Sequence, residues 1–336
     1  MKGDESIVSA SIKDVAVKAG VSVATVSHVI NNTRFVSDST KEKIMAAMEE
    51  LKYVPNSMAR SLRTNKTKTV ALLIPDISNF FFTEVAEAIE GVLSEKGYSL
   101  FLCNTGESLT IEKKQIIQMS AQLVSGIIIA PTSGDFDYRS MFADSNYPMV
   151  FIDRKTDKTQ ADVVMVDGKS ATYKAVSELI NRGHKRIGYI AGRDGLSTTV
   201  ERLSGYKQAI EDNGLEIDEN LIKRGNSKYE SGYSLTEELL TKTDATAVFV
   251  SNNLMSVGAI KCLSNKNIPI PERMAIVGFD DYNWATITNP PLSTIKQPVS
   301  TLGAMAAELV LKRIENPEGA YTEYSLPAEF IVRKSC

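Results

Sequence analysis

Polar and aromatic side chains follow a series of short apolar runs in the last four fifths of the sequence. The group consists of Asp76, Asn79, Phe81, Phe82, Asp153, Arg154, Arg202, Asn252, Asn253, Asp280, Asp281 and Gln297. Carboxylates, amides and a pair of arginines bind vicinal hydroxyl groups well, because a sugar hydroxyl both donates and accepts hydrogen bonds. Aromatic faces can cover the C–H side of a sugar ring. Each residue alone also fits a helix cap, a core side chain or a surface ion pair, but together they predict one small-sugar pocket.

The elements that must position these residues are predicted from the apolar pattern. Apolar runs predict buried parallel strands over 70–75, 99–103, 126–130, 149–153, 186–191, 247–250 and 274–279. Amphipathic stretches between them predict helices over 81–96, 169–182, 202–213 and 230–241. This repeated βαβ order predicts an α/β fold with parallel doubly wound sheets, and residues 69–336 are enough for two such lobes. Ligands of doubly wound sheets bind beyond the carboxyl ends of the strands, where the polar residues lie.

A second set of polar residues lies between positions 22 and 34. Ser22, Thr25, Ser27, Asn31, Thr33 and Arg34 have the chemistry of DNA phosphate contacts, and Val23, Ala24 and His28 are placed to reach base edges. Their setting is a helix that ends at Gly20, a turn, a second helix that Ser22 caps, and a third helix that Ser37 and Asp38 cap. This order predicts a helix-turn-helix unit, although a three-helix unit with no DNA role has the same packing pattern.

The charge distribution supports a nucleic-acid-binding head. Residues 1–68 hold 11 Lys and Arg against 7 Asp and Glu, while the remainder holds 27 against 34, within a net charge of −3. A small basic head on a larger acidic body favours DNA as the partner of the head. A solvated charged surface would show the same imbalance.

Composition limits which other classes of protein this chain could belong to. The chain has 336 residues, of which 43% are apolar, as expected of a globular protein with more than one domain. Its three cysteines match no metal spacing and fit a reducing cytoplasm, and the two histidines are far apart, so neither a metal nor a cofactor is expected. The polar N-terminus does not read as a signal peptide, and no apolar run is long enough for a membrane span.

Residues 11–63, from SIKDVAVKAGVSVATVSHVIN to NSMARSLR, resemble without a gap the head of LacI/GalR-family transcriptional repressors. The resemblance implies a hinge helix in the DNA minor groove, with Asn56, Ala59, Arg60 and Leu62 as its contact residues and Leu62 as the wedge between base pairs. The sequence itself supplies only a short helix that needs a partner to be ordered. His28 stands where the family more often has Arg, and TVSHVIN followed by RFV is similar to the ribose and purine repressor branch.

The rest of the chain resembles the periplasmic sugar-binding-protein-like core of the same family. The resemblance implies three crossings between lobes, near 165–169, 295–299 and 326. The predicted domains are a DNA-binding head at 1–54, a hinge and linker at 55–68, and an effector-binding and dimerisation core at 69–336. Within that core, lobe one covers about 69–166 and 298–326, and lobe two covers about 167–297 and 327–336.

The resemblance to ribose-responsive members implies an effector site. Nine residues match the types that line a ribose pocket: Asn79, Phe81, Phe82, Asp153, Arg154, Arg202, Asn252, Asp280 and Gln297. Two positions depart from that group, since Ser227 stands where an aromatic is usual and Asn253 where Asp is usual. A purine corepressor matches less well, because Leu196 and Ser227 replace an arginine and a stacking ring. The members of the family that couple to a phosphocarrier protein also match less well, because this chain has Glu308 where an Arg is expected.

These observations predict a dimeric, cytoplasmic transcriptional repressor that binds a pseudo-palindromic operator and responds to a ribose-like sugar. Ligand in the cleft would favour a closed body and change the pairing of the hinges by a population shift. The absence of a heptad tail favours a dimer over a tetramer. The alternatives are a purine- or other-ligand-responsive member of the family, an exported solute-binding protein, which would need a signal peptide, and an enzyme. No phosphate-binding glycine motif follows a strand, and Asp280 and Asp281 have no nucleophile or metal partner by spacing.

Overall fold

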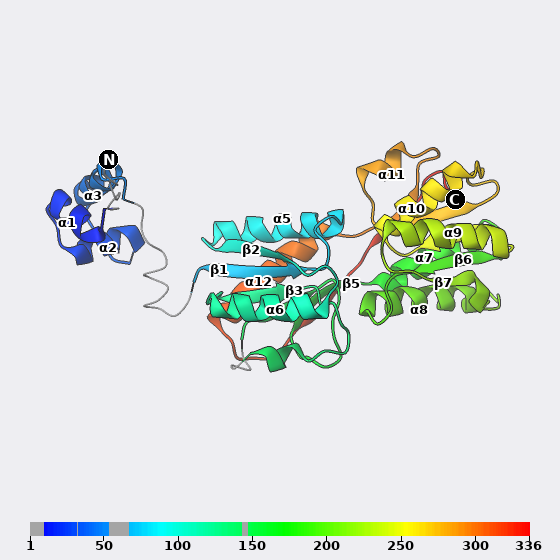
Figure 1. Cartoon of the computed structure of the whole chain (residues 1–336), viewed down its shortest axis with the longest axis horizontal. Helices are drawn as coiled ribbons and strands as arrows, with labels where there is room; N and C mark the ends of the chain where they lie inside the picture. Colours follow the sequence, from blue (N-terminus) through cyan, green and yellow to red (C-terminus); the bar gives the residue numbers. More distant parts are fainter. Residues whose placement is uncertain (1–9, 32, 54–66, 143–146) are drawn as a thin grey trace, which may run out of the picture. The chain divides into compact units, whose positions relative to one another are not determined.

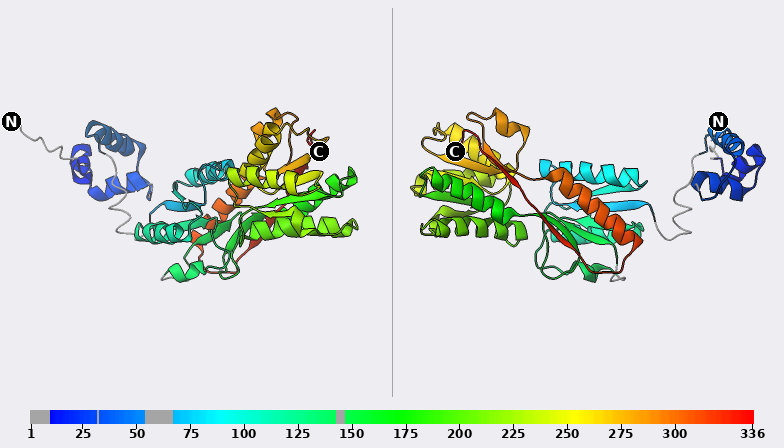
Figure 2. Two further views of the ribbon diagram at one scale, coloured as in Figure 1. Left: turned by 45° about the vertical axis from the view of Figure 1, so that its right-hand side comes forward. Right: turned by 180° about the vertical axis from the view of Figure 1, so that it is seen from behind.

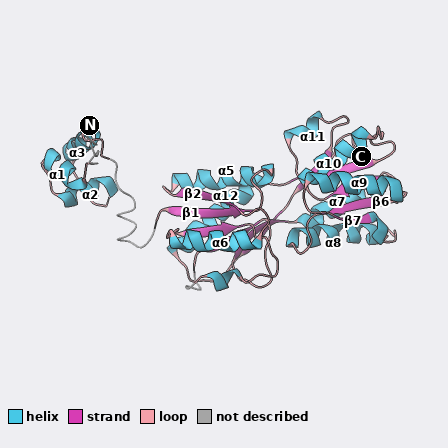
Figure 3. Ribbon diagram, viewed as in Figure 1, coloured by secondary structure: helices cyan, strands magenta, loops and turns pink. Residues whose placement is uncertain are grey.

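The computed structural model describes residues 10–31, 33–53, 67–142 and 147–336. Contacts within the chain divide it into two compact units, residues 1–67 and residues 68–336 (Figure 1). The first unit is all helical, and the second is an α/β body with two sheets (Figure 3).

The helical unit contains α1 (Ile12–Ala19), α2 (Val23–Asn31) and α3 (Asp38–Glu50). Ser11 and Asp14 cap the start of α1 reciprocally, and Gly20 ends it in the left-handed conformation at φ 67°. The Ser22 hydroxyl accepts a hydrogen bond from the Thr25 amide at 3.1 Å, which confirms Ser22 as the cap of α2. The prediction for Ser37 is wrong in detail. Ser37 is the N-cap residue of α3 but makes no side-chain cap hydrogen bond; its hydroxyl instead contacts the Thr40 hydroxyl at 2.9 Å.

The first sheet of the body runs in the order β11-β5-β4-β3-β1-β2, and all of its pairings are parallel. Its strands are β1 (Thr69–Ile74), β2 (Ser99–Asn104), β3 (Gly126–Ile129), β4 (Met149–Ile152), β5 (Asp162–Val166) and β11 (Glu323–Leu326). Helices α5 (Phe80–Glu95) and α12 (Val299–Glu315) cover one face of this sheet. Helix α6 (Leu109–Ala121) and the short helix η1 (Tyr138–Met141) cover the other face, so the sheet is buried on both sides.

The second sheet runs in the order β12-β10-β9-β8-β6-β7. Its strands are β6 (Ile187–Ala191), β7 (Ile222–Arg224), β8 (Ala247–Val250), β9 (Ala275–Phe279), β10 (Ser293–Lys296) and the antiparallel β12 (Glu329–Ile331). Helices α7 (Gly168–Asn181) and α8 (Ser197–Asp212) pack on one face, and α9 (Tyr229–Lys242) and α10 (Asn253–Asn265) on the other. The short helices η2 (Glu219–Leu221) and α11 (Asn283–Ile287) complete this lobe.

The chain passes between the two sheets three times, from β5 to α7, from β10 to α12 and from β11 to β12. Figure 2 shows the red end of the colour scale running from one sheet to the other. The predicted α/β fold with two parallel-dominated sheets is confirmed. The apolar pattern did not predict β5, β7, β10, β11 or β12. Strands β7, β10 and β11 carry polar residues, and β12 has three residues, so these four segments lack the apolar run that identifies the central strands. Strand β5 does contain such a run, from Val163 to Val166, and the same rule could have found it.

Candidate functional site

One cavity between the two lobes of the body contains the predicted pocket residues. It is lined by all nine of them, Asn79, Phe81, Phe82, Asp153, Arg154, Arg202, Asn252, Asp280 and Gln297, together with Gly192, Leu196, Thr198, Thr199, Ser227 and Ser251. The lining comes from the start of α5, the end of β4, the start of α8 and the segments after β6, β8, β9 and β10. The cavity volume is about 40 Å³, room for about three water molecules. A ligand the size of a sugar therefore enters only when the lobes or the lining side chains move.

The side of the cavity formed by the first lobe combines a buried ion pair with two aromatic rings. Asp153 and Arg154 follow β4 directly, and the Arg154 Nε lies 3.0 Å from the Asp153 Oδ2. Asp153 has φ 67°, a left-handed conformation that is uncommon outside glycine and that clusters at functional sites. The Arg154 guanidinium lies 5.8 Å from the centre of the Phe82 ring, and Phe82 packs edge-to-face on Phe81. The arrangement presents charge and an aromatic surface side by side.

The side of the cavity formed by the second lobe also contains one arginine and one carboxylate, Arg202 and Asp280. The Arg202 guanidinium lies 3.6 Å from the centre of the Phe279 ring, and its Nη1 donates to the Ser251 carbonyl at 2.7 Å. Gln297 donates its side-chain amide to the Asp280 carboxylate. Burial raises the pKa of Asp280 to about 6, although the Arg202 charge and the Gln297 hydrogen bond act in the opposite direction.

The pKa of Asp280 predicts pH-dependent ligand binding. A ligand that donates hydroxyl hydrogen bonds to Asp280 favours the ionised carboxylate, which exists mainly above pH 6. We expect full ligand affinity at pH 7–8 and, by linkage, about tenfold weaker binding for each pH unit below 6. Calorimetric titrations at pH 5, 6, 7 and 8 measure this slope.

Asp280→Asn is the matched control for the pH titration. The variant retains the shape of the side chain but does not ionise, so its weaker affinity should be flat over the same pH range. If ligand affinity falls as steeply with pH in Asp280→Asn as in the parent, the group that takes up the proton is not Asp280.

Asn79 and Asn252 have structural contacts in addition to lining the cavity. The Asn79 side chain accepts from the Phe81 amide at 3.1 Å and begins α5, and Asn252 accepts from the Met255 amide at 3.2 Å and begins α10. Asn253 does not line the cavity; its amide donates to Asn79 Oδ1 across the lobes at 2.7 Å. Asn79 and Asn252 therefore both cap a helix and line the cavity, and the cap roles were not predicted for them.

Two further strand-end carboxylates lie outside this cavity. Asp76 forms an ion pair with Lys228. Asp281 forms a bidentate ion pair with Arg333, with N···O distances of 2.7 and 3.0 Å. Strand-end position alone therefore does not place a residue in the cavity.

The sequence reasoning missed four lining residues, Gly192, Thr198, Thr199 and Ser251. Gly192 and Ser251 directly follow β6 and β8, so the strand-end rule that found Asp153 could have found them. Thr198 and Thr199 lie in the first turn of α8, which begins five residues before the predicted start at 202. The amphipathic pattern of this helix did not extend to its polar first turn.

Two polar atoms at the cavity are buried without a hydrogen-bond partner among the residues that the structure describes. One is the donor Arg202 Nε, and the other is the acceptor Gln297 Oε1. Burial of an unpaired polar group is unfavourable, and native structures seldom contain one without a reason. The pair leaves one donor and one acceptor for a ligand to satisfy after a small rearrangement.

The predicted DNA-reading residues lie in α2, at its N-cap and in the segment that follows it. Ser22, Val23, Ala24, Thr33 and Arg34 are exposed, and Thr25, Ser27 and His28 are half-buried. The His28 Nδ1 lies 2.9 Å from the Thr33 hydroxyl, a contact that sequence spacing did not predict. Thr33 therefore contacts the ring of a predicted base-reading residue. The side chain of Asn31 and the predicted hinge residues Asn56, Ala59, Arg60 and Leu62 lie outside the described residues.

Within the residues that the structure describes, no group of three His, Cys, Asp or Glu side chains is placed to hold a metal ion. No helix in the described ranges is long and apolar enough to cross a membrane.

Comparison with known proteins gives matches along almost the whole chain. Residues 11–56 match the family model described as bacterial regulatory proteins of the lacI family, and residues 67–334 match periplasmic binding proteins and the sugar binding domain of the LacI family. The HTH-type transcriptional repressor PurR of Vibrio atlanticus is 35% identical over 97% of this chain and 98% of its own length. PurR of Pasteurella multocida is also 35% identical, with the same coverage.

Solved structures agree with these matches. The Lac repressor bound to ONPG superposes with a TM-score of 0.86 at 27% identity, covering 97% of this chain and 99% of the other. A complex of the regulator CelR with cellobiose gives 0.75 at 31% identity, covering 97% and 100%. A structure described as a putative ribose operon repressor from Burkholderia thailandensis gives 0.73 at 32% identity, covering 79% and 98%.

A helical DNA-binding unit joined to a two-lobed body with a polar interlobe cavity defines a ligand-controlled transcriptional regulator. The chain belongs to the LacI family of bacterial regulators. It is a DNA-binding repressor of that family and not an enzyme.

Proposed function

We propose that this repressor binds a pseudo-palindromic operator as a dimer and is switched by a small, hydroxyl-rich ligand of the ribose type in the interlobe cavity. Helix α2 would lie in the DNA major groove, with Val23, Ala24 and His28 at base edges. Ligand in the cavity would shift the population between two lobe arrangements, and the two heads of the dimer would then fit the operator less well.

The observation that carries the sugar proposal is the chemistry of the cavity lining. Two carboxylates, Asp153 and Asp280, face two arginines, Arg154 and Arg202, with Phe81 and Phe82 beside them. Vicinal hydroxyls donate to carboxylates and accept from guanidinium groups, and the aromatic rings cover the apolar side of a sugar. The unpaired Arg202 Nε and Gln297 Oε1 need one acceptor and one donor, and a hydroxyl group supplies both.

A purine corepressor is the second candidate, and the curated relatives favour it. Repressors named PurR are 34–35% identical to this chain over nearly its full length. Against it, the structure places Leu196 and Ser227 in the cavity lining, and neither supplies the additional arginine nor the stacking ring that we associate with a purine site. Phe81 and Phe82 are the lining residues that could stack on a purine.

Calorimetric titration separates the two ligand classes. D-ribose, hypoxanthine and D-glucose are titrated into the full-length chain at pH 7.5 and constant salt. Micromolar binding of ribose alone supports the sugar proposal, whereas binding of hypoxanthine alone contradicts it and selects the purine candidate. If none of the three compounds binds, other sugars and sugar derivatives are tested next, and the assignment to the family is unchanged.

His28→Ala is expected to reduce operator discrimination. A good base-edge contact contributes about 1–3 kcal/mol of discrimination against the wrong base. The variant should therefore lose about 5- to 150-fold of its preference for operator over scrambled duplex and keep the ligand affinity of the parent, with salt fixed in both assays.

Thr33→Val is the partner variant, because the Thr33 hydroxyl contacts His28 Nδ1. If that contact positions the His28 ring, Thr33→Val has a smaller effect in the same direction and adds little to His28→Ala in the double variant. If His28→Ala discriminates between operator and scrambled duplex as well as the parent does, His28 does not read a base.

A further inference from the structure

Glu107 lies in the turn between β2 and α6, outside the cavity lining and outside the residues that the sequence predicted. Its side chain is 15% exposed. Both Gly106 and Glu107 adopt left-handed backbone conformations, at φ 60° and 59°. This conformation is unfavourable for a residue with a Cβ, and strain of this kind is found where a side chain must be held in one place.

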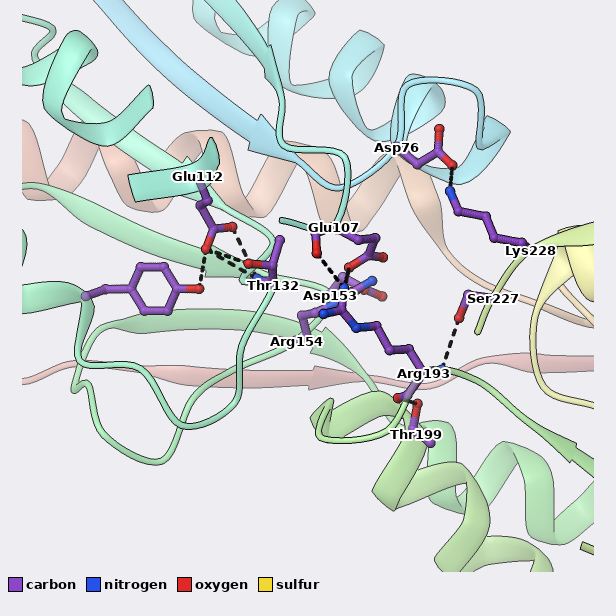
Figure 4. Close-up of polar contacts among 11 residues, drawn as sticks. Asp76, Glu107, Glu112, Thr132, Asp153, Arg154, Arg193, Thr199, Ser227 and Lys228 are labelled. Carbon is purple, nitrogen blue, oxygen red and sulfur yellow. Dashed lines mark hydrogen bonds and ion pairs between the residues drawn. The ribbon is translucent and has the colours of Figure 1, made fainter. Parts of the chain in front are cut away.

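Glu107 contacts an arginine from each lobe. The Arg154 Nη1 lies 3.4 Å from the Glu107 Oε2, and the Arg193 Nη1 lies 3.3 Å from the same oxygen. Arg193 also donates to the backbone carbonyl of Glu107 at 2.6 Å. Arg154 belongs to the first lobe and lines the cavity, whereas Arg193 follows β6 in the second lobe (Figure 4). One carboxylate therefore joins a cavity residue to the opposite lobe.

Arg193 is itself tied to the cavity wall. Its backbone amide donates to the Ser227 hydroxyl at 3.2 Å, and its carbonyl accepts from the Thr199 hydroxyl at 2.7 Å. Both Ser227 and Thr199 line the cavity. The path from Arg154 through Glu107 and Arg193 to Ser227 and Thr199 thus begins and ends at cavity residues of different lobes (Figure 4).

A second ion pair between the lobes joins Asp76 to Lys228. Its exposure is close to that of the Glu107–Arg193 pair, since the Lys228 and Asp76 side chains are 42% and 17% exposed and those of Arg193 and Glu107 are 40% and 15% exposed. Glu107 differs in that it also contacts the Arg154 side chain, which is 8% exposed and lines the cavity. Glu107 is also the residue that contacts two guanidinium groups at once. We therefore regard Glu107, and not Asp76, as the main electrostatic link between the cavity and the lobe arrangement.

We propose that Glu107 is a positioning residue that orients Arg154 toward the ligand and, through Arg193, holds the two lobes in the closed arrangement. Its role in closure does not depend on the ligand class, whereas its role toward the ligand rests on the proposed function. Loss of the Glu107 charge shifts the lobe equilibrium toward the open arrangement, and a ligand that requires the closed arrangement then binds more weakly.

The interlobe distance tests the closure role without any ligand. Spin labels are placed by Gln118→Cys on α6 and Gln208→Cys on α8, two exposed positions in different lobes. The native residues Cys103, Cys262 and Cys336 are buried, which favours labelling at the introduced sites. The labelled full-length chain is diluted into an excess of unlabelled chain, so that distances within one chain dominate the pulsed electron resonance measurement.

Three variants are compared in this background. Glu107→Gln removes one charge and is expected to increase the population of longer distances. Arg193→Gln removes the charge and also the hydrogen bond to the Glu107 carbonyl, so its shift should be at least as large. Asp194→Asn is the matched control, because Asp194 is the next residue and pairs with Arg224 within the second lobe, with both side chains about 60% exposed. Its distances should match those of the parent.

Unchanged distances in both Glu107→Gln and Arg193→Gln would overturn the proposal. In the ligand arm, Glu107→Gln should weaken D-ribose binding about tenfold, within the usual range of coupling between sites. If ribose does not bind the parent, ribose is not the ligand, and the distance measurement still decides the role of Glu107 in closure. Arg193→Gln, on the opposite lobe, keeps the test decisive should Glu107→Gln fail to fold.

Discussion

Replacement of Arg202 by methionine is expected to weaken ligand binding by about 30- to 1,000-fold. Hydrogen bonds to charged groups contribute about 1.5–3 kcal/mol each, and the guanidinium can make more than one to a ligand, so we expect a loss of about 2–4 kcal/mol. Methionine keeps much of the apolar contact with Phe279, over whose ring the guanidinium lies at 3.6 Å. Calorimetry with the ligand identified in the first titration measures the loss.

The control for this variant is Arg224→Met in the same lobe. Arg224 forms an exposed ion pair with Asp194, and its side chain is 62% exposed and outside the cavity lining. Arg224→Met should keep the ligand affinity of the parent. Operator affinity without ligand should also stay unchanged in Arg202→Met, because Arg202 contacts only the body. Ligand affinity equal to that of the parent would exclude Arg202 from the site.

Replacement of Arg313 by methionine is expected to lower the free energy of unfolding of the body by about 3–5 kcal/mol. Arg313 contacts both carboxylate oxygens of Asp162, at 2.8 and 3.0 Å, and donates to the carbonyls of Pro317, Gly319 and Ala320. The two side chains are 8% and 2% exposed. Removal of the guanidinium leaves the Asp162 carboxylate buried without its counterion and loosens the segment that leads into β11.

Urea denaturation followed by tryptophan fluorescence and circular dichroism measures this loss. Lys207→Met serves as the control, because the Lys207–Glu219 ion pair is exposed and such pairs contribute about 0–1 kcal/mol. We expect a large shift in the denaturation midpoint for Arg313→Met and a small one for Lys207→Met. Similar small shifts in both variants would show that the Arg313–Asp162 pair adds no more to stability than a surface pair.

The sequence predicted the central strands and the cavity by one physical rule. The runs before Asp76 and Asp153, and the run that ends at Phe279, are buried on both faces, so their apolar pattern is continuous and easily recognised. Parallel strands bring their carboxyl ends to one edge, so polar residues at these ends converge without any knowledge of the three-dimensional structure. Nine predicted residues from six segments line one cavity, and most of them lie at or just after the ends of these strands.

What the sequence did not predict depends on how separate segments meet. Strands β10 and β12 form an antiparallel pair at the edge of the second sheet. They have four and three residues, too few to show a recognisable hydrophobic pattern in the sequence. The Glu107–Arg193 contact depends on the packing of two lobes, and the His28–Thr33 contact depends on the turn after α2. Residue spacing carries no signal for contacts of this kind.

The most direct test of the account is the binding of the full-length chain to DNA, with and without ligand. An operator is selected from random duplexes, and its affinity is compared by fluorescence anisotropy with that of a scrambled duplex at one salt concentration. We expect operator binding to be at least about 10³-fold tighter than binding to the scrambled duplex, and we expect that affinity to change when ligand fills the cavity. Equal affinity for the two duplexes, or an operator affinity that saturating ligand leaves unchanged, would contradict this expectation.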